Sequence, residues 1–156
     1  MTSFEQIRGN LVRQQKGLEL LLSLLEEEFS LLRESKTEEV VALEFSIHEL
    51  LRQLADERMV MKSVMQGTRV AEYADMLEAE QGGELKGLLQ AIDDAEQKSA
   101  RQATHNAQLS LALLDQSQEL FDYLYEQVTP KAEPAYGAKG GYKTHRPEAA
   151  LFNGRA

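Results

Sequence analysis

The chain has 156 residues, a formal net charge of −9 and no cysteine. This length fits about one domain, and the absence of cysteine excludes a disulfide framework and a thiolate metal site. It also fits a reducing cytoplasm. The first residues show no basic segment followed by an apolar run, so we expect neither a signal peptide nor direct membrane insertion. We therefore expect a cytoplasmic protein.

The charge is divided unevenly along the chain. Residues 1–130 carry 12 Lys and Arg against 24 Asp and Glu, whereas residues 131–156 carry 5 against 2. Nucleic-acid binding depends on clustered basic side chains that neutralise phosphates, and the acidic body lacks such clusters. We expect no nucleic-acid partner.

A first helix is predicted at about residues 4–34. Ser3 and Gln6 have the spacing of a capping box at its start. Leu20, Leu24 and Leu31 lie beside the main stripe and make the apolar face broad enough for two neighbours, which favours a bundle over a two-stranded coil. The main stripe has heptad spacing and consists of Phe4, Ile7, Leu11, Leu18, Leu21, Leu25 and Leu32.

The heptad pattern resumes in a second predicted helix at about residues 38–65. The short connector before it makes this helix antiparallel to the first. Gln66-Gly67 and Gln81-Gly82-Gly83 both weaken helical structure, so we interpret residues 66–83 as a short helical elbow.

A third helix is predicted at about residues 84–127. Leucine and isoleucine side chains mark its first part, and Leu109, Leu113, Leu120 and Leu124 mark its last part. Between them the seam consists of Ala95, Ser99, Ala103 and Asn106, which buries little apolar surface. The C-terminal half of this helix is therefore the part that we expect to move or to accept a partner.

The predicted fold is all-α: a long antiparallel three-helix bundle, or coiled-coil-like rod, over residues 1–128. The basic segment 129–156 contains Pro130 and Pro134, which cannot continue a helix, and several glycines with few apolar residues between them. We interpret it as a flexible C-terminal tail.

The sequence offers no set of catalytic or metal-binding residues. A di-iron bundle needs Glu-x-x-His pairs, but Phe45, Gln102 and Tyr142 occupy the positions three residues before the histidines. Acidic runs along the helices are typical of a solvated face, and His48 lies one residue beyond a seam position. The glycines of segment 137–144 do not have the spacing of a phosphate-binding loop. We predict no enzyme activity, cofactor or metal.

Four features resemble the FlgN family, the flagellar type III export chaperones of the hook–filament junction proteins. They are the long leucine-rich first helix, the run Leu50-Leu51-x-x-Leu54-x-x-x-Arg58, the motif Thr104-His105-Asn106, and the segment 133–140 around Tyr136-Gly137-Ala138-Lys139-Gly140. Two positions depart from the family pattern. Ile47-His48 stands where members often carry a lysine, and Lys139 stands where they often carry an aspartate.

The resemblance implies a cytoplasmic chaperone that binds the C-terminal segments of the junction (hook-associated) proteins. It would prevent their premature association and deliver them to the flagellar export gate. The family's substrate contact corresponds here to Leu109, Leu113, Leu120, Phe121, Tyr123 and Leu124. Docking to the cytoplasmic domain of the gate corresponds to Tyr136, with Gly137 and Gly140 beside it.

Two alternatives remain at this point. The chain fits a structural or regulatory coiled-coil adaptor whose tail is an unrelated recognition motif, and its leucine face leaves self-association open. Within the chaperone class, another flagellar cargo is also compatible with the heptads, since periodicity does not distinguish a binding groove from a core.

Overall fold

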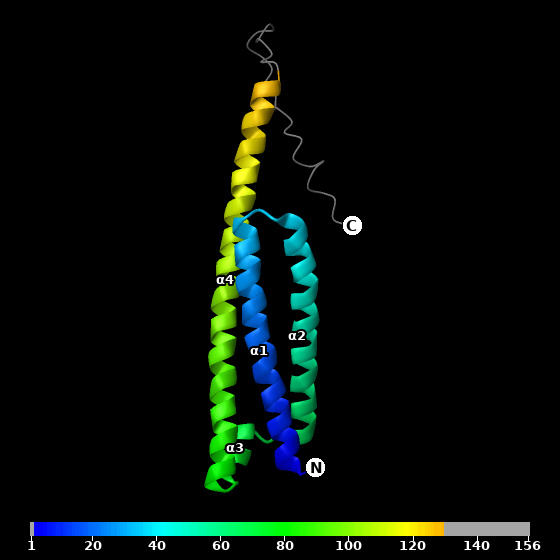
Figure 1. Ribbon diagram of the computed structural model, residues 1–156, viewed down its shortest axis with the longest axis vertical. Helices are drawn as coiled ribbons and strands as arrows, with labels where there is room; N and C mark the ends of the chain where they lie inside the picture. The colour runs from blue at the N-terminus through cyan, green and yellow to red at the C-terminus, as the bar shows by residue number, and fades with distance from the viewer. Residues whose placement is uncertain (1, 130–156) are drawn as a thin grey trace, which may run out of the picture. The chain divides into compact units, whose positions relative to one another are not determined.

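The structure, a computed structural model, describes residues 2–129 and is all-helical over them (Figure 1). The helices are α1 (Ser3–Arg33), α2 (Thr37–Met65), α3 (Val70–Asp75) and α4 (Ala79–Val128). The all-α prediction is confirmed. The chain divides into two compact units, Met1–Ser117 and Gln118–Ala156. The division into a bundle at 1–128 and a tail at 129–156 stays a prediction.

In the first unit α1, α2 and the early part of α4 lie side by side (Figure 1). Asn10 near the start of α1 contacts Glu57 near the end of α2, so these helices are antiparallel as predicted. Arg8 pairs with Glu84 near the start of α4, so α4 runs parallel to α1. The core comes from all four helices: Ile7, Leu11, Leu18, Leu21, Leu25, Ile47, Leu54, Met61, Met65, Ala74, Leu85, Ile92 and Ala95.

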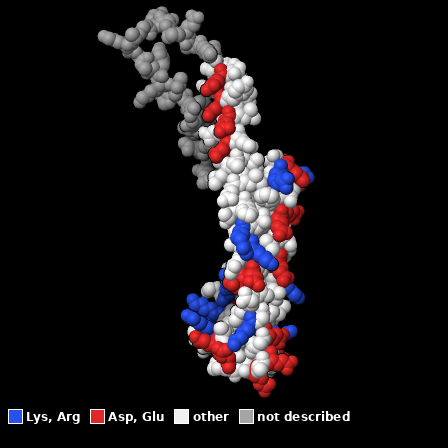
Figure 2. All heavy atoms as spheres, turned by 90° about the vertical axis from the view of Figure 1, so that its left-hand side faces the viewer, with Lys and Arg blue, Asp and Glu red and all other residues white. Residues whose placement is uncertain are grey.

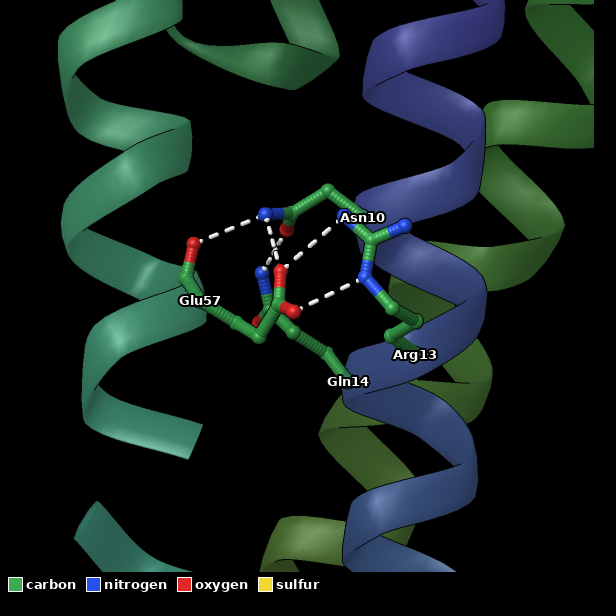
Figure 3. A network of polar contacts seen from close by, with 4 residues as sticks. All are labelled: Asn10, Arg13, Gln14 and Glu57. Carbon is green, nitrogen blue, oxygen red and sulfur yellow. Dashed lines mark hydrogen bonds and ion pairs between the residues drawn. The ribbon is translucent and has the colours of Figure 1, made fainter. Parts of the chain in front are cut away.

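A polar network sets the register of α1 against α2 (Figure 3). The buried Asn10 amide donates to the backbone carbonyl of Glu57 at 2.8 Å and to its carboxylate at 2.7 Å. Arg13 donates to the same carboxylate at 2.8 Å, and Gln14 donates to the Asn10 side-chain oxygen. Because each buried polar group has a partner, sliding one helix past the other would leave unpaired amides in the core.

The capping box of α1 lies one residue earlier than predicted. Thr2, not Ser3, is the N-cap: its hydroxyl accepts from the Glu5 amide at 3.3 Å, and the Glu5 carboxylate accepts from the Thr2 amide at 2.8 Å. Both candidate pairs have the right spacing. Glu5 brings a negative charge to the first turn, where the helix dipole favours an anion, and the neutral Gln6 does not.

The end of α2 agrees with the prediction from the sequence, whereas the start of α4 does not. Gln66 and Gly67 adopt left-handed backbone angles and end α2 at Met65. The predicted interruption at Gln81-Gly82-Gly83 is wrong, because α4 begins at Ala79 and runs through both glycines. A β-carbon on Gly82 would lie 2.4 Å from the Ala74 carbonyl oxygen. Gly82 therefore allows α3 to pack against the first turns of α4.

Adjacent glycines give a test of this close approach. Gly82→Ala should lower the stability of the fold by about 1–3 kcal/mol, because its methyl group meets backbone that cannot rotate away. Gly83→Ala is the matched control: a β-carbon there meets nothing within 4 Å, so the better helix propensity of alanine should raise stability by roughly 0.5–1 kcal/mol. Thermal unfolding followed by circular dichroism measures both, and equal responses would contradict the packing described.

Candidate protein-binding surface

Asn106 marks the last buried seam position of α4. The residue is 2% exposed, and its amide donates to the Leu25 carbonyl of α1 at 2.8 Å and to the Glu28 carboxyl at 2.9 Å. Its side-chain oxygen accepts from Gln102 one turn earlier, at 3.0 Å. This set of bonds joins two helices whose residues are about 80 positions apart in the chain.

The predicted seam of α4 packs against the other helices at three of its four positions. Ala95, Ser99 and Asn106 are all buried, and only Ala103 of the four predicted seam positions is exposed. Their small or polar side chains do contribute little apolar area. The attachment of α4 here depends on the hydrogen bonds of Asn106, which hydrophobic periodicity does not reveal.

Glu28 is a buried acid within the same contact. Burial raises the pKa of its carboxyl to about 7; the neighbouring Glu44 carboxyl on α2 also raises it, and the Asn106 hydrogen bond opposes the shift. One carboxyl oxygen, Oε1, accepts from Asn106, while Oε2 has no hydrogen-bond partner. Acidic runs were predicted to form a solvated face, and Glu28, which is 7% exposed, departs from that prediction.

The predicted contact residues on α4 differ in exposure. Leu109 and Leu113 belong to the first unit and are half-buried. The second unit contains the exposed members of the set: Leu120, Phe121, Tyr123 and Leu124, of which Leu120 and Tyr123 are each 58% exposed. The structure therefore presents large apolar side chains to solvent where the sequence predicts a binding surface.

Helical spacing gathers most of these side chains on one face of α4. Leu120, Leu124 and Val128 follow one another at intervals of four residues, and Phe121 and Tyr125 form the adjacent row. The Phe121 and Tyr125 rings stack with centroids 6.5 Å apart. We call this group the apolar stripe: Leu120, Phe121, Leu124, Tyr125 and Val128. Tyr125 and Val128 were not among the predicted residues, although their four-residue spacing from Phe121 and Leu124 identifies them.

The opposite face of this helical segment is acidic. Glu119, Asp122 and Glu126 lie three and four residues apart, which places them in one row away from the apolar stripe. Figure 2 shows acidic side chains following one another along the C-terminal part of α4. The segment is thus amphipathic, and an exposed apolar face of this kind is typical of a protein-interaction site.

The described residues were also searched for a metal site and for a membrane-spanning helix. Among residues 2–129 there is no group of three or more metal-ligating side chains, and no helix in that range is long and apolar enough to cross a membrane. His48 is exposed on α2, with its ring 3.6 Å from the Glu44 carboxyl, as expected for a solvated histidine. The predicted gate-docking residues, Tyr136, Gly137 and Gly140, lie outside the described residues.

Comparison with known protein families gives a match over most of the chain. The family model described as FlgN protein matches residues 1–144, which covers the four described helices and the segment around Tyr136. The curated proteins and the solved structures that were searched gave no match. The family match extends over far more than half of the 156 residues. The chain therefore belongs to the FlgN family, the flagellar export chaperones for hook–filament junction proteins.

Proposed function

We propose that this protein is a cytoplasmic chaperone that binds the C-terminal segments of flagellar hook–filament junction proteins and delivers them to the export gate. The family supports the general role of a flagellar export chaperone. The observation that carries the proposed cargo contact is the apolar stripe of α4, whose large side chains are exposed to solvent.

The stripe has the chemistry needed to cover an amphipathic segment. Fully burying a leucine or phenylalanine side chain contributes about 1.5–3 kcal/mol, so a few of these residues would supply a useful affinity. An amphipathic helix of the cargo would lay its apolar face on the stripe, and the cargo face that promotes self-association would then be covered. Leu109, Leu113 and Tyr123 complete the proposed contact set.

Export also requires that the bound segment can be released and threaded. A contact made by one helical face holds the cargo through side chains alone and imposes no fixed tertiary structure on the rest of it. This favours a holding function over a folding function. It also fits an acidic chaperone body that contributes no catalytic residues to the contact.

Truncation of the stripe tests the cargo contact. The combined variant Leu120→Ala, Phe121→Ala and Leu124→Ala should weaken binding of a junction-protein C-terminal segment by at least ~100-fold, because three anchors lose about 1 kcal/mol or more each. Alanine favours helix, so helical content should be kept. Isothermal titration calorimetry measures the affinity, and circular dichroism checks the fold.

A change on the other face of the same segment provides the control. Glu119→Ala lies opposite the stripe and should leave the affinity within about threefold of the original value. If the original protein and the triple variant bind the junction-protein segment with equal affinity, the proposed contact is contradicted. Stable self-association of the original protein, with no binding to a junction protein, would instead support the coiled-coil adaptor.

Delivery to the gate is proposed to depend on Tyr136, with Gly137 and Gly140 beside it. An amphipathic tyrosine next to glycine can make a compact, reversible contact. Tyr136→Ala should abolish binding to the purified cytoplasmic domain of the export gate and leave junction-protein affinity unchanged, as measured by surface plasmon resonance. Tyr142→Ala, a second tyrosine in the same segment, is the control. Loss of cargo affinity in Tyr136→Ala would refute this division of roles.

A further inference from the structure

The contact between α1, α2 and α4 contains a buried acid that cargo binding does not use. Glu28 on α1 is 7% exposed and shares its site with Asn106 of α4 and Glu44 of α2. Asn106 bonds to one carboxyl oxygen of Glu28, and the other carboxyl oxygen has no hydrogen-bond partner. Unpartnered buried carboxylate oxygens are costly, so this arrangement calls for a physical explanation.

A proton accounts for the arrangement. Two ionised carboxylates cannot hydrogen-bond to each other, because neither has a hydrogen to donate. When Glu28 carries a proton, its unpartnered oxygen can donate a hydrogen bond to the Glu44 carboxyl, and no buried negative charge remains on Glu28. Asn106 can still donate to Oε1 of Glu28 in this state, so all three helices are joined.

We propose that Glu28 and Glu44 form a proton-operated latch beside Asn106, which fastens α4 to α1 and α2 while Glu28 carries a proton and loosens when Glu28 is ionised. Asn106 donates a stronger hydrogen bond to an ionised Glu28, but the cost of burying that charge outweighs the gain. Asn106 is the last buried residue of α4, so the latch controls the end of the packed part of that helix. The inference concerns the free chaperone and holds whichever cargo binds.

The side chains that act on the Glu28 carboxyl come from the two helices packed against α1. Glu44 and Asn106 face Glu28 from α2 and α4, and Asn106 is uncharged. His48 on α2 lies 3.6 Å from Glu44, on the exposed side of that helix. The contribution of His48 is therefore measured separately, with a variant of its own.

The direction of the pH effect follows from the Glu28 pKa. It is raised from 4.5 to about 7 in the native protein, so the fastened state binds the proton more tightly than the open state. Stabilisation by the latch is complete below about pH 4.5 and is lost as the pH rises through about 7. The latch therefore loosens near neutral pH as the solution becomes more alkaline.

Amide hydrogen exchange of the full chain between pH 6 and pH 8 tests the latch. After correction for the intrinsic exchange rate, the opening equilibrium of α4 around Asn106 should rise about tenfold over this range, which follows from a pKa near 7 when closed and 4.5 when open. Glu28→Gln imitates the protonated acid, since its amide can donate to Glu44 and its oxygen can accept from Asn106. This variant should stay closed and lose the tenfold change.

Two controls make the outcome specific. Glu27→Gln changes the exposed neighbouring acid and should behave like the original protein. His48→Asn removes the histidine beside Glu44 and should keep the pH response. The proposal is overturned if Glu28→Gln retains the response of the original protein, if the original protein shows no response, or if the response disappears in His48→Asn. A carbon-detected NMR titration of the Glu28 carboxyl gives a second readout that does not depend on opening.

Discussion

The packing of α4 depends on the hydrogen bonds that Asn106 makes to α1. Leucine and isoleucine anchor the first turns of this helix, but the seam from Ala95 to Asn106 offers small and polar side chains. Two donated hydrogen bonds, at 2.8 and 2.9 Å, compensate for the missing apolar area. Buried amide bonds also tolerate little displacement, so they fix where along α1 the helix sits.

This attachment separates two uses of one helix. Up to Asn106 the seam positions of α4, except Ala103, are buried against other helices, and in the second unit the apolar stripe remains exposed. A chaperone needs both properties, because an apolar surface that binds cargo must stay exposed and cannot also pack into the chaperone's own core. In α4 the hydrogen bonds of Asn106 hold the seam, and the leucines of the apolar stripe stay exposed within the same helix.

The sequence predicts the repeating features well and the single contacts poorly. Heptad spacing predicts α1 and α2 and the exposed leucines of α4. The sequence-based prediction misplaces the start of α4, because the low helix propensity of glycine suggests a break at Gly82, whereas Gly82 lies inside the helix and allows the Ala74 carbonyl to approach. It also misses the burial of Glu28, since an acid in the run Glu26-Glu27-Glu28 looks solvated until Asn106, 78 residues away, is placed against it. Long-range partners of polar groups are not encoded in local periodicity.

A hydrogen-exchange footprint of the cargo tests directly whether cargo binds to the apolar stripe of α4. The full chain would be measured alone and with the C-terminal segment of a junction protein from the same organism. We expect the amides of residues 79–106 to be protected already in the free chain and the cargo to add protection mainly at residues 118–128. Protection gained on α2, with no change in the amides of the apolar stripe, would contradict the assignment of cargo binding to α4.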